Sequence, residues 1–129
     1  MALIWEMHDD AERALRRRPT FRAHLCAVAN DADVAAAELI YGELLANVVR
    51  HARGRVEVRL ELDDAAPVLV VRDFGPGMRS VPYDPRREPM AESGRGLAIV
   101  ERLAEDLEVE RIPDGGTMIR AKLPTGAGV

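Results

Sequence analysis

Four polar side chains recur at helical spacing in the segment from Glu43 to His51. Asn47, Arg50 and His51 follow Glu43 by four, seven and eight residues, so a helix would carry all four on one stripe. A carboxylate can orient or deprotonate a nucleophile, and an amide oxygen one turn further on is a ligand that Mg²⁺ accepts beside water and phosphate oxygens. Taken alone, the same spacing also fits a solvated helix face, so its interpretation depends on the rest of the chain.

A first glycine segment follows an apolar run and has the sequence Asp73-Phe74-Gly75-Pro76-Gly77. Glycine lets a backbone approach a flat ligand closely, and a buried carboxylate beside it can accept a hydrogen bond from an exocyclic amine such as that of adenine. The alternative is a tight turn that contains Gly-Pro-Gly.

A second glycine segment, Ser93-Gly94-Arg95-Gly96-Leu97, is expected to be a loop that runs into an amphipathic helix. The N–H groups at a helix N-terminus lack intrahelical partners, and glycines let phosphate oxygens reach them. The segment does not follow a strand of a βαβ unit and has no Gly-Lys-Ser/Thr after it. Neither the dinucleotide fingerprint nor the P-loop therefore fits.

Hydrophobic periodicity predicts the helix that carries the polar stripe. Ile40, Leu44 and Val48 form an apolar stripe on a helix that we expect from about Asp33 to His51, and Gly54 is the glycine that follows its C-terminus. Ahead of this helix, the pattern predicts a short strand over 3–7 and a helical stretch over 10–29. Asp9 or Asp10 would cap that stretch, and Pro19 would kink it or divide it into two helices.

Beyond Gly54 the period changes to two, which predicts strands. Residues 55–62 alternate between charged and apolar, and residues 68–71 are continuously apolar; with a turn at 63–67 they form an antiparallel hairpin. A second hairpin is predicted over 108–112 and 117–123, with its turn at Pro113-Asp114-Gly115-Gly116.

Composition limits the class of protein. The 129 residues predict a single domain over 1–129, and with a net charge of −4 and scattered basic residues we expect no nucleic-acid partner. Arg16-Arg17-Arg18 is the one basic run. It fits the solvent-exposed side of a helix better than a phosphate- or nucleic-acid-binding patch, because no aromatic residues interleave with it. The single Cys26 fits a reducing compartment, and no apolar run approaches a membrane span. We therefore expect a cytoplasmic protein without a membrane partner.

The order of these motifs resembles the GHKL-type ATPase superfamily shared by gyrase, histidine kinases and MutL. A helix with E-x-x-x-N, a hairpin ending in D-x-G-x-G, a loop, G-x-G-L-x-I-V and a Gly-Thr strand follow one another from about Ala35 to Leu123. Within the superfamily, the chain is most similar to the small bacterial anti-sigma-factor serine kinases and their switch-protein relatives. The segment from Glu43 to Ala52 and the strand and helix at the N-terminus carry that likeness.

The resemblance implies an α+β fold of the Bergerat type. It would be a two-layer α/β sandwich, with a mixed, mostly antiparallel sheet under a layer of helices and a short lid from Arg79 to Glu92. ATP and Mg²⁺ would lie between the helical layer and the lid.

The resemblance also implies roles for individual residues. Asn47 would ligate Mg²⁺, Glu43 would activate the attacking hydroxyl, and Asp73 would accept a hydrogen bond from the adenine amino group. Further nucleotide-binding positions would be Arg50, His51, Gly75, Gly77, Gly94, Arg95, Gly96, Leu97 and Thr117. Among these, Arg50 would face phosphate, the second glycine segment would wrap the phosphates, and Thr117 would support the Asp73 end through a water. His51 would face ribose or adenine, or serve only in packing.

Three functions remain compatible with the sequence. The first is an ATP-dependent serine/threonine kinase that phosphorylates a small anti-sigma-factor antagonist and sequesters a sigma factor or another partner. The second is an ATP-binding interaction switch without transfer, for example an activator of a phosphatase. The third is a detached histidine-kinase catalytic domain. Kinases of this family often have a basic residue just before the Ser-Gly of the second glycine segment, where this chain has Glu92, whereas Glu43 favours transfer.

The resemblance further predicts a homodimer formed through the N-terminal strand and helix. Leu3, Trp5 and Leu15 offer apolar side chains for such an interface, or belong to the ordinary core.

Overall fold

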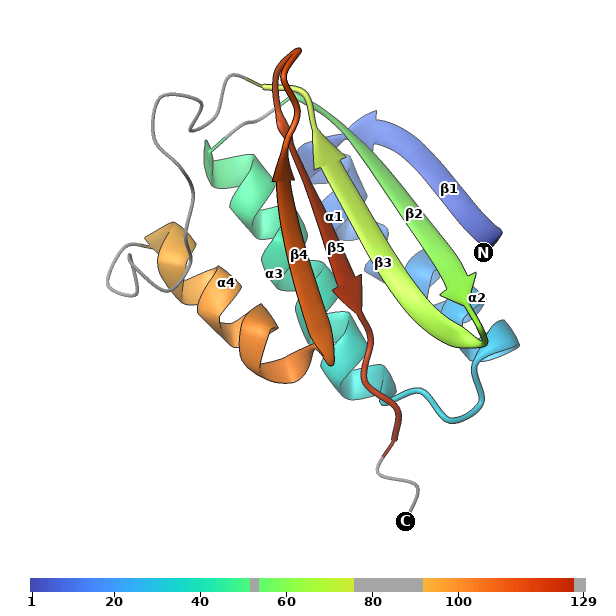
Figure 1. Ribbon diagram of the computed structural model, residues 1–129. Coiled ribbons are helices and arrows are strands. Elements are labelled where there is room, and N and C mark those ends of the chain that lie inside the picture. The colour runs from blue at the N-terminus through green and yellow to red at the C-terminus, as the bar shows by residue number, and fades with distance from the viewer. Residues whose placement is uncertain (52–53, 76–91, 127–129) are drawn as a thin grey trace.

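The computed structural model describes residues 1–51, 54–75 and 92–126. Within them, strands and helices follow the order β1 (Ala2–Asp10), α1 (Ala11–Arg16), α2 (Arg18–Val28), α3 (Val34–His51), β2 (Arg55–Asp63), β3 (Ala66–Asp73), α4 (Glu92–Leu103), β4 (Asp106–Arg111) and β5 (Thr117–Lys122). The helices form one layer and the strands another, as Figure 1 shows. The predicted two-layer α/β sandwich is confirmed.

The five described strands form one sheet in the order β1-β2-β3-β5-β4. Every pairing in it is antiparallel, so the expected mixed sheet is an antiparallel one over the residues that the structure describes. The physical reason is the connectivity. Short turns join β2 to β3 and β4 to β5, and β5 adds to the free edge of β3 in the antiparallel sense.

The turn between β2 and β3 is shorter than the five residues expected. Asp63 pairs with Ala66, so the loop consists of Asp64 and Ala65 alone, and both have positive φ, 51° and 70°. This is the two-residue turn whose twist matches that of the flanking strands. Pro67, which suggested a longer turn, lies in β3 opposite Leu62.

Pro19 divides the predicted N-terminal helical stretch into two helices. Asp10 caps α1, because its carboxylate accepts a hydrogen bond from the Glu12 N–H at 2.9 Å. α1 ends at Arg16, and α2 begins at Arg18 with Pro19 in its first turn, where a missing N–H costs little. Arg17 stands between the two helices as the C-cap of α1 and the N-cap of α2.

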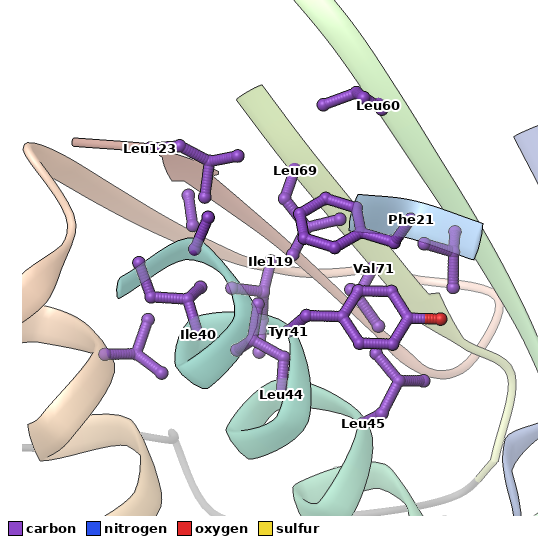
Figure 2. Close-up of a cluster of buried hydrophobic side chains, with 14 of the residues drawn as sticks. Phe21, Ile40, Tyr41, Leu44, Leu45, Leu60, Leu69, Val71, Ile119 and Leu123 are labelled. Carbon is purple, nitrogen blue, oxygen red and sulfur yellow. The ribbon is translucent and has the colours of Figure 1, made fainter. Parts of the chain in front are cut away.

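The hydrophobic core lies between α3 and the sheet. Phe21 from α2 stacks on Tyr41 from α3 with ring centroids 4.7 Å apart, and both are fully buried. Figure 2 shows the two rings above Leu44 and Leu45 of α3, with side chains of the sheet closing the cluster from the other side. The Tyr41 hydroxyl donates a 2.6 Å hydrogen bond to the carbonyl of Ala14, which ties α1 to α3.

The N-terminal apolar residues divide between core and surface. Trp5 and Leu15 are half-buried and pack against the core, and the Trp5 ring stacks on His24 at 5.4 Å. Leu3 is 55% exposed on edge strand β1. Within the described residues, no helix has both the length and the hydrophobicity that crossing a membrane requires.

Candidate functional site

Asn47 is a buried polar residue on a helix that is otherwise packed by apolar side chains. Only 6% of it is exposed, and Leu44, three residues before it, and Val48, the next residue, are both buried. Its Oδ1 has no hydrogen-bond partner in the part of the chain that the structure describes. A buried amide oxygen without a partner is costly, on the order of 1–3 kcal/mol, so this position suits a group that a ligand or ion completes.

The other members of the predicted stripe differ in exposure. Glu43 is half-buried one turn before Asn47, whereas Arg50 and His51 are exposed in the last turn of α3. Arg50 lines a hollow of about 460 Å³ together with Asp10, Ala11, Glu12, Val49 and Gly54. The structure therefore places Glu43 and Asn47 one turn apart on α3, and Arg50 beside the start of α1.

Asp73 is the last residue of β3, and β5 holds it in place. The backbone N–H groups of Thr117 and Gly75 hydrogen-bond its carboxylate and lower its pKa, as does the charge of Arg72. Burial has the larger effect and leaves the pKa of Asp73 raised above its usual value. Its Oδ1 has no partner among the described residues. Asp73 is thus a second buried acceptor that a ligand could complete.

Gly116 is the residue of this region that the sequence reasoning did not assign to the site. Its φ is +91°, and a Cβ at this position would overlap the carbonyl of Asp73 and contact the Cα of Phe74 at 3.0 Å. The β4–β5 turn therefore supports the Asp73 corner by backbone contact alone. The signal for this role was the glycine pair directly before Thr117, which the sequence interpretation used for the turn and for the Gly-Thr motif without assigning it a role at Asp73.

The second glycine segment differs from the expected loop. α4 already begins at Glu92, so Gly94, Arg95 and Gly96 lie in its first helical residues rather than before it. Two glycines cost a helix about 1 kcal/mol each, and the burial of Leu97 and Val100 in the core offsets this cost. The first N–H groups of α4 have no intrahelical acceptor, so the helix start still offers donors for an anion.

The candidate residues come from the same end of the sandwich. Figure 1 shows the C-terminal end of α3, the end of β3 and the β4–β5 turn at one end of the molecule, and α4 packs beside α3. Gly77 and the lid residues 79–91 lie outside the described residues. Two acceptor oxygens without partners among the described residues and a glycine-bearing helix start fit a nucleotide with its cation. The nucleotide offers an amine for one oxygen and phosphate oxygens for the helix start, and the cation can bind the other oxygen.

Comparison with known proteins agrees with this geometry. The family described as "Histidine kinase-like ATPase domain" matches residues 8–123 of the chain. The anti-sigma F factors of Bacillus subtilis (strain 168) and Bacillus velezensis are 25% and 26% identical to it over 91 residues. Each of these matches covers 63% of this chain and 62% of the relative, so the chain spans about three-fifths of the length of the curated relatives.

Solved structures resemble the chain in fold. The histidine kinase domain of the E. coli osmosensor EnvZ has a TM-score of 0.52 and 20% identity, with 100% of this chain and 92% of that chain covered. The Acinetobacter baumannii histidine kinase AdeS has a TM-score of 0.52 and 16% identity, with 93% and 68% covered. At these identities the likeness concerns the fold alone.

Proposed function

Because the chain belongs to the family of histidine kinase-like ATPase domains, we propose that it is an ATP-dependent protein serine/threonine kinase of the anti-sigma-factor type. Its substrate would be a small antagonist protein, and a sigma factor would be a second partner. Family membership implies ATP as the nucleotide, and the finer assignment draws on the likeness to anti-sigma F factors.

The observation that carries this proposal is the pair of buried, unpartnered acceptors on α3 and β3. Asn47 Oδ1 and Asp73 Oδ1 both lack a hydrogen-bond partner among the described residues, and each fits a different part of Mg-ATP. The Asn47 oxygen suits a hard cation, whereas the Asp73 carboxylate suits the amino group of adenine.

Glu43 is the residue that favours phosphoryl transfer over binding alone. It is half-buried one helical turn before Asn47, so its carboxylate lies on the helix that would hold the cation. In the proposed reaction, a serine or threonine hydroxyl of the antagonist gives its proton to Glu43 and forms a bond to the γ-phosphorus, while the bond from that phosphorus to the bridging oxygen of ADP breaks. Bound Mg²⁺ would neutralise phosphate charge during this step. The start of α4 would donate backbone N–H groups to the phosphates.

The experiment is incubation of the full chain with ATP labelled in its γ-phosphate and with candidate antagonist proteins, followed by mapping of the labelled residue. Label on serine or threonine supports the proposal, whereas label on histidine indicates a histidine-kinase catalytic domain. Nucleotide binding without transfer indicates the interaction switch, an alternative favoured by Glu92 at the first position of α4, where this family often has a basic residue.

Glu43→Ala separates transfer from binding. We expect it to leave the Kd for Mg-ATP within about twofold of the unmodified chain and to slow transfer by roughly 10²–10⁴-fold, the contribution typical of a general base. Leu39→Ala is a matched control, because Leu39 lies one turn before Glu43 on the same helix and is 45% exposed. Transfer at the normal rate by the Glu43→Ala chain would show that this carboxylate is not the base.

A homodimer formed through β1 and α1 is part of the same proposal. Leu3 supports it as an exposed apolar side chain on an edge strand, whereas Trp5 and Leu15 pack in the core. Analytical ultracentrifugation of the full chain and of Leu3→Lys tests it. We expect the substitution to shift the chain from dimer to monomer, and a chain that is monomeric at all concentrations would contradict the dimer.

A further inference from the structure

The elbow between α1 and α2 forms a shallow, strongly basic surface, separate from the proposed nucleotide site. A hollow of about 290 Å³ is lined there by Arg13, Arg16, Arg17, Pro19 and Thr20. We propose that this arginine hollow binds an acidic segment of a partner protein, through the carboxylates of its aspartate or glutamate side chains.

Charge is concentrated at this elbow against the trend of the whole chain. Residues 11–28 hold five arginines and one glutamate, a formal charge of +4, whereas the chain carries −4, which leaves −8 for the remainder. Arg13 lies three and four residues before Arg16 and Arg17, so the three guanidinium groups are neighbours on one surface. Like charges at this spacing destabilise a helix by a few tenths of a kcal/mol per pair. A bound anionic segment would offset that repulsion.

The guanidinium groups that line the hollow are largely unpaired. Neither Arg13 nor Arg16 forms an ion pair with any residue that the structure describes, and Arg16 reaches only the carbonyl of Glu12, at 3.4 Å. Arg17 lies 3.7 Å from the carboxylate of Asp9, with 54% of its own side chain exposed. Apart from the Arg16 Nε–H and the Arg17 group that faces Asp9, the N–H donors of these arginines are therefore available for carboxylates, which they can bind in bidentate fashion.

The backbone that carries these arginines is fixed to the core. The Arg17 N–H donates to the Ala14 carbonyl at 3.0 Å, and the Arg17 carbonyl accepts from Thr20 and Phe21. Phe21 is fully buried, and the Tyr41 hydroxyl holds the Ala14 carbonyl from the other side. An arginine surface on a rigid elbow loses less backbone entropy on binding than one on a free segment.

The start of α2 adds to the positive potential. α2 has eleven residues, its N-cap Arg17 makes no side-chain capping hydrogen bond, and no acidic residue stands in its first turn. A helix start normally attracts negative side chains, but here the flanking residues are Arg17 and Arg18. An acidic segment from outside would supply the charge that this position lacks.

An acidic protein segment fits this surface better than nucleic acid or a free anion. The hollow has no aromatic side chain on which a nucleic-acid base could stack. Its arginines are exposed, so a single small anion would stay hydrated and bind weakly. Several carboxylates on one segment can contact several arginines at once, which raises the affinity of the segment. The proposed role of the arginine hollow does not depend on the kinase proposal.

The test is fluorescence anisotropy with a labelled ten-residue glutamate peptide, and with the corresponding glutamine peptide as the neutral control. The full chain should bind the glutamate peptide at about 50 mM salt, more weakly at about 200 mM, and should not bind the glutamine peptide. The Arg13→Gln, Arg16→Gln double variant should raise the Kd roughly tenfold, since exposed pairs contribute up to about 1 kcal/mol each. Arg55→Gln, Arg102→Gln removes the same charge from exposed sites elsewhere and should change the Kd by less than about twofold.

Several outcomes would overturn the proposal. These are equal weakening by the two double variants, no binding of the glutamate peptide by the unmodified chain, or stronger binding of duplex DNA or inorganic phosphate than of the peptide. The Arg13→Lys, Arg16→Lys double variant keeps the charge but loses the bidentate geometry of arginine. Its Kd for the glutamate peptide should lie between those of the unmodified chain and of the Arg13→Gln, Arg16→Gln variant. Mg-ATP binding, measured on the same samples, should be unchanged in every variant. A failure of peptide binding is then distinct from a failure of the kinase proposal.

Discussion

Gly116 packs directly against the backbone of Asp73, so closely that a Cβ on the glycine would overlap the Asp73 carbonyl. The contact joins the turn before β5 to the end of β3, and Thr117, the next residue, hydrogen-bonds the Asp73 carboxylate through its N–H. The position of the proposed adenine acceptor is therefore set by a residue that itself has no side chain.

Gly116→Ala should displace Asp73 and weaken nucleotide binding. The φ of +91° costs an alanine about 1–2 kcal/mol, and the overlap with Asp73 adds to it. We expect urea unfolding to show a loss of at least about 2 kcal/mol, and calorimetry to show at least a tenfold weaker Kd for Mg-ATP.

Gly54→Ala is the control for this substitution. Gly54 also has a positive φ, +74°, but nothing lies within 4 Å of the point that a Cβ on this residue would occupy. The Gly54→Ala chain should lose about 1–2 kcal/mol of its free energy of unfolding through backbone strain and keep its affinity for Mg-ATP. Equal effects of the two substitutions on nucleotide affinity would contradict the role of Gly116.

Asn47 provides a second prediction, in which stability and binding change in opposite directions. The amide oxygen of Asn47 is buried and has no partner among the described residues. Replacing this side chain by an apolar one of similar size removes the desolvation cost of that oxygen, so Asn47→Leu should leave the free energy of unfolding unchanged or raise it by about 1 kcal/mol. The same change removes the proposed Mg²⁺ ligand. Binding of Mg-ATP should fall at least tenfold, and Asn47→Ala should abolish the Mg²⁺-dependent part of binding. A clear loss of stability in Asn47→Leu would indicate a structural amide instead.

Asp73→Asn should weaken ATP binding through the direction of its hydrogen bonds. The N–H groups of Thr117 and Gly75 donate to this side chain, so an amide would turn its oxygen toward them and its NH₂ toward the nucleotide. Two donors would then face each other where adenine needs an acceptor. Losing a hydrogen bond to a charged group costs about 1.5–3 kcal/mol, or roughly 10- to 100-fold in Kd.

The same substitution should stabilise the chain without nucleotide at neutral pH. The pKa of Asp73 is raised in the folded state, mainly by burial, so the protonated carboxyl contributes stability that is fully present below the ordinary value of 3.8 and lost as the pH rises through the folded pKa. The difference in Tm between Asp73→Asn and the unmodified chain should therefore be small near pH 3 and grow toward pH 7. A difference that shrinks with rising pH would contradict this assignment.

Most of the fold follows from the hydrophobic periodicity of the sequence and from its capping and turn residues. The sequence predicted the helix around Glu43 and Asn47, an interruption at Pro19 as either a kink or a division, and both hairpins. Each of these has a local cause in apolar spacing, capping or turn residues. The turn at Asp64 and Ala65 was misjudged, because Pro67 suggested a loop and because an alanine with positive φ gives no signal in the sequence.

What the sequence could not supply is the set of contacts between distant segments. The packing of Gly116 under Asp73 joins residues 43 positions apart, and nothing at either position predicts how closely the two backbones approach. Likewise, the helical state of Gly94 to Gly96 depends on how Leu97 and Val100 enter the core, which outweighs the low helix propensity of glycine. The roles assigned to the nucleotide-binding residues remain predictions.

Tyr41 gives a prediction that concerns the elbow and leaves the nucleotide site untouched. Its hydroxyl donates to the Ala14 carbonyl at 2.6 Å, and burial raises its pKa well above the ordinary 10.0. Tyr41→Phe keeps the ring stacked on Phe21 but removes the hydrogen bond, so it should lower the free energy of unfolding by about 1 kcal/mol at pH 7 without changing Mg-ATP affinity. Above pH 10 the unfolded tyrosine ionises while the folded one stays protonated, which lowers the stability of the unmodified chain relative to Tyr41→Phe. Urea unfolding at pH 7 and pH 10.5 should show that the unmodified chain exceeds Tyr41→Phe in free energy of unfolding by less at the higher pH. The same difference at both pH values would mean that the hydroxyl is not buried in the folded chain.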